Sequence, residues 1–468
     1  MQRGDELVVT LESAAFEGKN IARLDNLVVF VRGGVPGDTA RTRLTKIKKQ
    51  FLEADFVELL SPSPDRVSAP CIHFGPCGGC KWQELAYEAQ LSFKRQQVVD
   101  ALTRLGGFRD LVVPPVLGAT NTLYYRNKME FSFGRRWRLP NASEAEPEWA
   151  LGLHIAERFD KVLDLDECRL QSEVSAHIVN FTRDYALANN ISIYSTTSHS
   201  GLLRNLVIRE SRRTSERMVN LVTFEDRPEI MHEFTSALVA KFPGVTTVDN
   251  NVNLRKSQVA LGDFEKIYHG PGYITERIGN RRYRISANSF FQTNTDQAER
   301  LYNVVRDFAG LTGSEVVYDL YSGTGTIALH LADQAKVIVG IESVEQSITD
   351  ARSNAEFNGV TNCTFLAGDL KDRLTRDADW QRQFPRPDVV VLDPPRSGMH
   401  EKAATQLLTL GAQRIVYVSC NPTTQARDLK ILTGDGRYAI QAVQPVDMFP
   451  HTYHIENVVL LSSASPRA

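Results

Sequence analysis

The sequence predicts a protein of three parts: a small N-terminal β-barrel, a central α+β domain and a C-terminal, doubly wound α/β domain. Short alternating apolar and polar runs between glycines occupy residues 1–62. Strand-like and helical runs mix over residues 63–280, and strands alternate regularly with helices over residues 281–468. At 468 residues the chain has room for about three domains of ordinary size.

The composition is that of a globular protein without a membrane-spanning segment. Hydrophobic residues make up 42% and charged residues 24% of the chain, and no apolar run approaches the roughly 20 residues that a membrane helix needs. The start, MQRGDELVV, lacks the charged-then-apolar pattern of a secretory signal. We therefore expect a cytoplasmic protein, acting as a monomer. Because the net charge is −2, any binding of nucleic acid must use local basic patches.

The first 62 residues have the pattern of a small barrel. Glycine-containing turns separate four alternating runs, at 6–11, 27–31, 39–44 and 51–59. Barrels of this size often bind oligonucleotides, and a basic run lies on this one at residues 41–49. An inert accessory barrel is the alternative. The Pro/Ser segment 61–64 that follows has the composition of a linker.

Three of the six cysteines, Cys71, Cys77 and Cys80, lie within ten residues, and glycines and a proline between them let three sulfurs converge. With the distant Cys168 they form a set of four thiols, which suits either a four-iron, four-sulfur (4Fe-4S) cluster or zinc. The spacing of five and then two residues favours the cluster. His73 is a less favoured ligand. Such a cluster would fasten two segments together, with electron transfer as the alternative role.

The remaining part of the central region mixes both kinds of element. Helical patterns cover residues 84–105, 173–188 and 230–242, and strand-like runs cover 128–133, 151–154, 202–209 and 218–222. Several arginines and lysines lie on or beside these strand runs, as a sheet face that grips an RNA backbone would require.

The C-terminal domain carries a pattern typical of a nucleoside site. A glycine-rich turn, Asp319-Leu-Tyr-Ser-Gly-Thr-Gly325, follows the first strand and precedes a helix. Acidic residues follow the next two strands: Glu342 is placed to accept hydrogen bonds from ribose, and Asp369 to meet an adenine amino group. A dinucleotide site prefers G-x-G-x-x-G, but position 328 is alanine, so the turn favours S-adenosylmethionine (SAM) over NAD.

The fourth and fifth strands of this domain end in candidate catalytic residues. Asp393-Pro-Pro-Arg396 resembles the motif of enzymes that methylate planar nitrogens, but Arg396 replaces the aromatic ring on which a base would stack. Cys420 follows the next strand, where an open α/β sheet binds its ligands. A buried structural cysteine is the alternative interpretation.

A thiol at this position suggests methylation of carbon 5 of uracil. A thiolate that adds to carbon 6 turns the ring into an enolate whose carbon 5 can attack a methyl donor. A base must then remove the proton on carbon 5. Glu456 is our choice, because it immediately precedes the closing strand; His451 and His454 are the rival bases.

Five ordered motifs resemble the RNA uracil-5-methyltransferase family: SFFQTN, DLYSGTGT, DPPRSG, VYVSCNPTTQARDL and HTYHIENVVLL. The N-terminal part, with VPGD at 35–38, resembles a TRAM domain, an RNA-binding, OB-like β-barrel. The resemblance implies a Rossmann-like SAM-dependent methyltransferase domain, a cluster on Cys71, Cys77, Cys80 and Cys168, Cys420 as nucleophile and Glu456 as base. It also implies contacts to SAM or the target uracil from Gln292, Tyr321, Glu342 and Asp393, with Asp369 as a further SAM contact.

The same resemblance predicts an RNA partner. Members with both a TRAM-like barrel and four cluster cysteines resemble enzymes of 23S ribosomal RNA, whereas the transfer-RNA enzymes of many bacteria lack both, so ribosomal RNA is preferred over tRNA. The target base is expected to flip out of its stack toward Cys420. A non-catalytic SAM- and RNA-binding protein is the rival from another class. A radical-SAM enzyme would need C-x-x-x-C-x-x-C, which the five-residue first gap does not provide.

Overall fold

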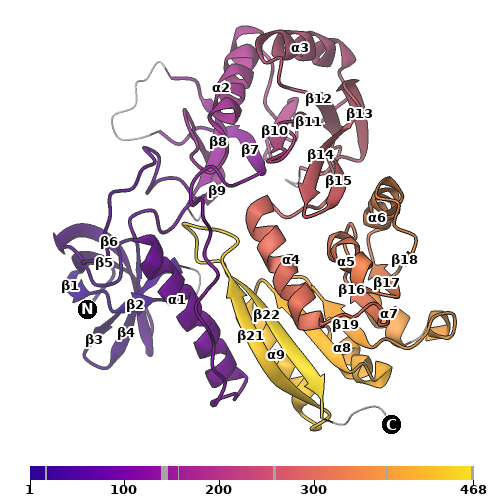
Figure 1. The fold of residues 1–468 in the computed structure, drawn as a ribbon. Coiled ribbons are helices and arrows are strands. Elements are labelled where there is room, and N and C mark those ends of the chain that lie inside the picture. Colours follow the sequence, from indigo (N-terminus) through magenta and orange to yellow (C-terminus); the bar gives the residue numbers. More distant parts are fainter. Residues whose placement is uncertain (16–17, 139–145, 157, 257–259, 376–377, 465–468) are drawn as a thin grey trace.

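The computed structural model describes residues 1–468 except 16–17, 139–145, 157, 257–259, 376–377 and 465–468. The described strands form a six-stranded sheet near the N-terminus, a seven-stranded central sheet, a two-stranded hairpin and a seven-stranded C-terminal sheet (Figure 1). None of the helices in this part of the chain combines the length and apolar character that crossing a bilayer requires.

The N-terminal sheet has the order β1-β5-β6-β4-β3-β2 and encloses a small core around Val29 and Leu52. The expected linker after it is held in place, because the buried Asp38 accepts hydrogen bonds from the Ser63 amide (2.9 Å) and from the Arg66 guanidinium (2.6 Å). The strands are β1 (Glu6–Thr10), β2 (Ser13–Ala14), β3 (Asn20–Leu24), β4 (Leu27–Arg32), β5 (Thr39–Ile47) and β6 (Phe51–Ser61).

Helix α1 (Tyr87–Asp100) continues into the π-helical turn η2 (Ala101–Leu105). The sequence predicts a single helix over residues 84–105, so the observed helix begins three residues later and ends at the predicted residue. Its apolar side chains Val98 and Leu102 are fully buried in the same core as the C-terminal sheet. The segment that connects the first two parts of the chain is thus packed onto the third.

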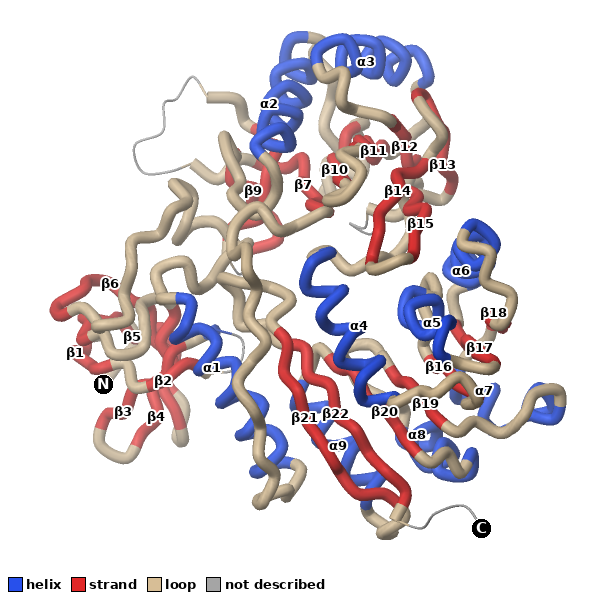
Figure 2. Tube along the Cα trace, in the orientation of Figure 1, coloured by secondary structure: helices blue, strands red, loops and turns tan. Residues whose placement is uncertain are grey.

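The central sheet has the order β13-β12-β11-β10-β7-β8-β9, and its helices α2 and α3 lie next to each other (Figure 2). Apolar strand residues such as Met129 and Phe131 share one core with apolar residues of both helices. Helix α2 (Glu173–Ala188) begins and ends where the sequence predicts. Helix α3 (Pro228–Lys241) begins two residues before its predicted start and ends one residue before its predicted end. The strands are β7 (Lys128–Arg135), β8 (Trp149–Ile155), β9 (Arg158–Asp164), β10 (Leu203–Glu210), β11 (Arg217–Thr223), β12 (Thr247–Val252) and β13 (Phe264–His269).

The hairpin of β14 (Tyr273–Ile278) and β15 (Arg281–Ser286) joins the central sheet to the C-terminal domain. Asn354 of the helix α6 (Glu345–Phe357) accepts a hydrogen bond from the Arg284 amide (2.8 Å), which holds the hairpin against that domain. The proposed boundary between residues 280 and 281 falls in the turn of this hairpin.

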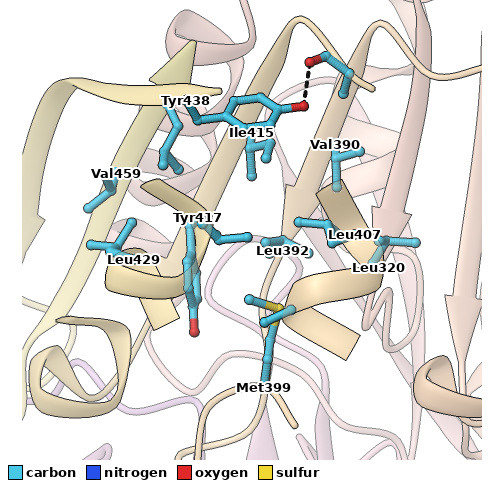
Figure 3. Packing of buried hydrophobic residues seen from close by; sticks show 14 of the residues in the cluster. Leu320, Val390, Leu392, Met399, Leu407, Ile415, Tyr417, Leu429, Tyr438 and Val459 are labelled. Carbon is cyan, nitrogen blue, oxygen red and sulfur yellow. Dashed lines mark hydrogen bonds between the residues drawn. The ribbon is translucent and has the colours of Figure 1, made fainter. Parts of the chain in front are cut away.

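The C-terminal sheet has the order β18-β17-β16-β19-β20-β22-β21, with five parallel strands and two antiparallel ones at the end. The alternation of strands and helices that the sequence predicts here is present, and apolar cores cover both faces. Figure 3 shows part of one of these cores. The strands are β16 (Val316–Leu320), β17 (Val337–Glu342), β18 (Cys363–Ala367), β19 (Val389–Leu392), β20 (Arg414–Ser419), β21 (Tyr438–Val446) and β22 (Glu456–Ser463). The main helices are α4 (Thr295–Ala309), α5 (Thr326–Leu331), α6 (Glu345–Phe357), α7 (Leu370–Thr375), α8 (Glu401–Leu407) and α9 (Pro422–Thr433).

Candidate active site

Strand register brings Cys420 and Glu456 to one edge of the C-terminal sheet. β22 runs antiparallel to β20 with Ser419 opposite Asn457, so Cys420, just after β20, lies beside Glu456, the first residue of β22. Asp393 follows β19, the parallel neighbour of β20, at the same edge. Cys420 is half-buried and Glu456 is buried. Three residues that the sequence singled out therefore meet at the carboxyl ends of the parallel strands.

Buried polar side chains of α9 and its cap hold this edge together. The Asn421 side chain caps α9 through the Thr423 amide (3.1 Å) and donates to the Arg396 carbonyl oxygen (3.1 Å). Asp428 accepts from the Met399 amide (2.8 Å), which ties the loop after β19 to the helix that follows Cys420. Sequence reasoning missed both roles, although polar residues at buried helix positions were a usable signal.

Gln425 fixes β20 relative to β22. Its Nε2 donates to the carbonyl oxygens of Tyr417 and Asn457, each at 3.0 Å, and its Oε1 accepts from Asn457 Nδ2 at 2.7 Å. Because Tyr417 lies on β20 and Asn457 on β22, these bonds lock the register that sets Cys420 beside Glu456.

Burial dominates the electrostatics of the three candidates. It raises the pKa of Cys420 to about 12, with the Glu456 and Asp393 carboxylates adding to the rise and Arg396 opposing it. Burial also raises the pKa of Asp393 to about 7. Burial and Asp393 together raise the pKa of Glu456 well above its ordinary value. The resting thiol is therefore protonated and must lose its proton as it attacks.

The rival bases differ in their surroundings. His451 is buried, has a left-handed φ of 64°, and its carbonyl oxygen accepts from the Lys81 (2.9 Å) and Trp82 (3.1 Å) amides, so its bonds are structural. His454 has its ring centroid 4.3 Å from that of Tyr453. Burial, Arg396 and two further cations lower the pKa of His454 to about 4, which keeps that ring neutral.

The glycine-rich turn after β16 is tightly folded and open on one side. Tyr321 has a left-handed φ of 68°, and its amide donates to the Ile341 carbonyl oxygen at 3.0 Å. A Cβ atom on Gly325 would lie 2.8 Å from the Phe365 ring, so this position requires glycine. A Cβ atom on Gly323 would meet nothing within 4 Å, which leaves room for a ligand there.

The other expected SAM contacts Glu342, Asp369 and Gln292 also make hydrogen bonds within the fold. Glu342 accepts from the Gly323 amide (3.2 Å) and the Val344 amide (2.9 Å). Asp369 is exposed and accepts from the Lys371 amide (2.9 Å) in the first turn of α7. Gln292 is half-buried, and its carbonyl oxygen accepts from Asn127 Nδ2 at 2.9 Å.

Two buried polar atoms beside the turn lack a partner among the described residues: Asp319 Oδ1 and Ser322 Oγ. Buried polar groups are normally hydrogen-bonded, so these atoms point to a polar ligand. Together with the open side of Gly323, they fit the amino and carboxylate groups of an amino-acid-like ligand such as SAM.

The four cysteines expected to bind a cluster line one small pocket. Cys71, Cys77, Cys80 and Cys168 are all half-buried there, and His73 Nε2 accepts from the Asp166 amide at 3.1 Å. Burial raises the pKa of Cys77 to about 11 and that of Cys80 to about 12. Within the described residues, no three His, Cys, Asp or Glu side chains are arranged to hold a single metal ion.

Comparisons with known proteins show the family of this chain. Residues 250–464 match the tRNA (Uracil-5-)-methyltransferase family, and residues 1–57 match the TRAM domain. An uncharacterized RNA methyltransferase of Porphyromonas gingivalis is 46% identical over 96% of this chain and 98% of its own length. One of Chlorobaculum tepidum is 44% identical over 99% of this chain and 97% of its own length.

A solved structure extends the likeness to the whole fold. The tRNA (uracil-54, C5)-methyltransferase of Pyrococcus abyssi, solved with S-adenosyl-L-homocysteine, superposes with a TM-score of 0.77 and 30% identity over 97% of this chain and all of that one. The chain therefore belongs to the TRAM-containing RNA uracil-5-methyltransferase family and is a SAM-dependent RNA uracil-5-methyltransferase.

Proposed function

We propose that this enzyme methylates carbon 5 of one specific uridine by covalent catalysis, with Cys420 as nucleophile and Glu456 as base. The observation that carries the proposal is the β20–β22 register, which sets these two residues side by side next to Asp393. A thiol and two carboxyl groups with raised pKa values at one ligand-binding edge can move protons as well as form a covalent bond.

In the first step, Cys420 Sγ bonds to carbon 6 of the flipped uracil. Its proton passes to the Asp393 carboxylate, which suits this task because its pKa of about 7 leaves it partly ionised near neutral pH. The electron pair of the carbon 5–carbon 6 double bond moves onto the ring as an enolate. Arg396 assists, because its cation favours the thiolate.

When bound, SAM would supply a methyl group on a positively charged sulfur, and this methyl group is the electrophile for the nucleophilic carbon 5. The Glu456 carboxylate then accepts the proton from carbon 5, and its raised pKa makes it a strong acceptor once ionised. The electrons of that carbon–hydrogen bond restore the ring double bond and expel the Cys420 thiolate. The thiolate recovers its proton from Asp393, so one proton remains on Glu456 for each methyl transferred.

We propose that Gln292, Tyr321, Glu342, Asp369 and Asp393 form the SAM site. The open side of the glycine-rich turn and the unpartnered atoms of Asp319 and Ser322 support it. In Asp369, the oxygen Oδ1 caps α7, so only its second oxygen is available for adenine.

We propose that Cys71, Cys77, Cys80 and Cys168 hold a 4Fe-4S cluster. The support for it is that the four thiols line one pocket, where each is half-buried. When bound, the cluster would join the loop of residues 71–80 to the segment around Cys168.

For the substrate we propose a uridine of 23S ribosomal RNA, with a tRNA uridine as the second candidate. The Pyrococcus abyssi relative is a tRNA methyltransferase, and it aligns with 97% of this chain. Sharing these domains therefore does not distinguish an rRNA substrate from a tRNA substrate. Mapping 5-methyluridine in total RNA from cells with and without the protein tests both candidate substrates. The 5-methyluridine that is missing in cells without the protein identifies the substrate. Unchanged 5-methyluridine in every RNA would overturn the proposed function.

The nucleophile is tested with a matched pair of cysteine variants. Cys420→Ala should abolish transfer of labelled methyl groups to RNA while RNA affinity is retained. Cys363→Ala is the control, because this half-buried thiol lies at the start of β18, the opposite end of the sheet from Cys420. Turnover by the Cys420 variant would defeat the covalent mechanism.

A further inference from the structure

A cavity of about 580 Å³ lies on the face of the central sheet that the helices α2 and α3 leave open. Side chains alternate between the two faces of a strand, so Lys128, Glu130 and Ser132 of β7 point away from the core that contains Met129. Asn205 of β10 lies opposite Ser132 in the register and also lines the cavity. The floor is therefore a row of polar side chains.

The wall of the cavity is the segment 287–290, which links the hairpin to α4. The buried Arg209 holds it, because its Nη2 donates to the carbonyl oxygens of Ala287 (3.2 Å) and Ser289 (2.5 Å). Asn288 donates to Glu265 Oε2 at 3.0 Å. These bonds fix the wall without a ligand, so the cavity is pre-formed. They also engage the buried Arg209 within the protein.

Several buried polar atoms around the floor lack partners among the described residues. Asn220 is 1% exposed and lines the cavity; its Oδ1 accepts from the Asn251 amide (3.2 Å), but its Nδ2 has no acceptor. His154 also lines the cavity, and its buried Nδ1 has no hydrogen-bond partner among the described residues. Asp249, next to Asn220 in the register, has no partner for either oxygen. Buried polar groups without partners destabilise a fold, so this cluster indicates that a polar ligand completes it.

The rest of the lining suits a nucleobase. Phe290 is 64% exposed, whereas Tyr194 is buried with its ring against the Arg204 guanidinium (4.2 Å) and the Phe224 ring (4.8 Å). An exposed aromatic ring beside amide donors and acceptors is the combination that binds unstacked bases of RNA. The volume is in the range of small-ligand sites.

The cavity also adjoins the site of methyl transfer. The Phe290 carbonyl oxygen accepts a hydrogen bond from Thr324 Oγ1 (3.1 Å) in the glycine-rich turn. Gln292, an expected SAM contact, lies two residues farther along. The cavity therefore lies beside the turn at which the methyl donor is expected.

We propose that the cavity binds a second, unstacked nucleotide of the same RNA and thereby selects which uridine reaches Cys420. This inference rests on the proposed function. Asn205 and Asn220 supply hydrogen bonds to the base edge, and the exposed Phe290 ring stacks on it. Lys128, whose Nζ is paired with Glu130 Oε1 at 2.5 Å, is the cation at the floor.

Asn205→Leu tests the proposal, because it keeps the side-chain size but removes the amide. The probe is total RNA from cells that lack the protein, which carries the unmodified target. The apparent KM for this RNA should rise roughly tenfold or more, as expected for a lost base contact, with kcat and SAM affinity unchanged. Asn189→Leu, an exposed position at the end of α2, is the matched control. An unchanged KM in the Asn205 variant would overturn the proposal.

A nucleotide scan locates the second contact and separates the two proposals. In an RNA fragment around the mapped uridine, abasic substitution at one flanking position should weaken wild-type binding but cause no further loss in Asn205→Leu. If no position behaves in this way, the cavity does not bind a base. If the wild-type enzyme transfers no methyl group to this RNA, the proposed function itself fails.

Discussion

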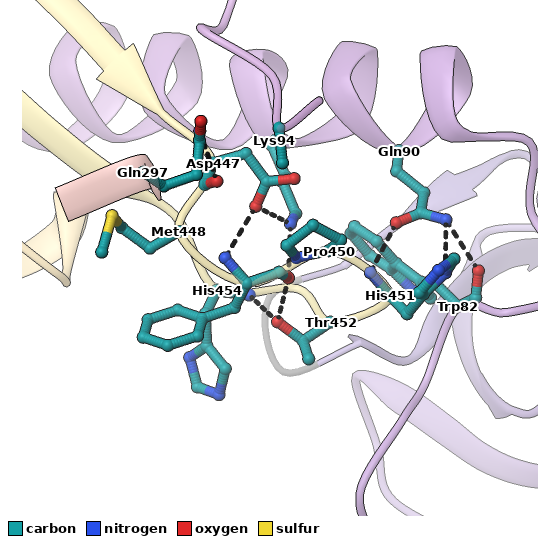
Figure 4. A network of polar contacts seen from close by, with 12 residues as sticks. Trp82, Gln90, Lys94, Gln297, Asp447, Met448, Pro450, His451, Thr452 and His454 are labelled. Carbon is teal, nitrogen blue, oxygen red and sulfur yellow. Dashed lines mark hydrogen bonds and ion pairs between the residues drawn. The ribbon is translucent and has the colours of Figure 1, made fainter. Parts of the chain in front are cut away.

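Replacing Lys94 by methionine tests how the loop before Glu456 is held. Lys94 of α1 donates to Asp447 Oδ1 at 2.6 Å and to the Phe449 carbonyl oxygen at 3.0 Å, and both charged side chains are fully buried (Figure 4). Methionine fills similar space but carries no charge. The variant therefore leaves the Asp447 carboxylate buried without its cation.

Breaking a buried ion pair by removing one partner costs about 3–5 kcal/mol. Asp447 keeps two neutral donors, the Tyr87 hydroxyl (2.8 Å) and the Phe449 amide (3.0 Å). We therefore expect the lower end, about 3 kcal/mol of unfolding free energy, which is a large share of the roughly 5–15 kcal/mol of an ordinary domain.

Urea denaturation followed by circular dichroism measures this loss. The control is Arg104→Met, since the Arg104–Asp100 pair on the adjoining turn is solvent-exposed (76% and 39%) and its loss should cost less than about 0.5 kcal/mol. Adding Asp447→Asn to Lys94→Met should restore part of the stability, because the amide removes the stranded charge. A loss below about 1 kcal/mol in Lys94→Met would refute the reasoning.

Three further predictions concern the active site and the thiol pocket. Glu456→Gln should leave methylated RNA covalently bound to Cys420, visible as an RNA–protein band on a denaturing gel; release at the wild-type rate would exclude Glu456 as the base. Burial and the Asp393 carboxylate raise the pKa of Asp319 from 3.8 to about 7, so the folded state keeps a proton that the unfolded chain loses, and stability falls as pH rises through this range. Asp319→Asn should flatten that fall in urea denaturation at several pH values, and an unchanged slope would contradict the assignment. Cys71→Ser should lower the iron content of anaerobically purified protein and its melting temperature, and iron equal to the wild type would argue against the cluster.

Much of the C-terminal domain could be predicted from the sequence. Its parallel strands are buried on both faces, so each is a continuous apolar run, and chemistry-bearing residues such as Glu342, Asp393 and Cys420 directly follow these runs. The strand β12 was not predicted, because its sequence TVDNNV lacks an apolar pattern. Of its buried asparagines, Asn251 belongs to the polar network beside the cavity, because it bonds to Asn220 and Asn288.

The sequence by itself determined the elements, the family motifs and the residues at strand ends, because hydrophobic periodicity and turn residues act over a few neighbouring positions. Only the tertiary structure decided that Cys420 faces Glu456, that Lys94 binds a carboxylate 353 residues away, and that Asn205 and Asn220 share one cavity. Strand order, register and helix docking arise from packing between distant segments, which local patterns do not encode.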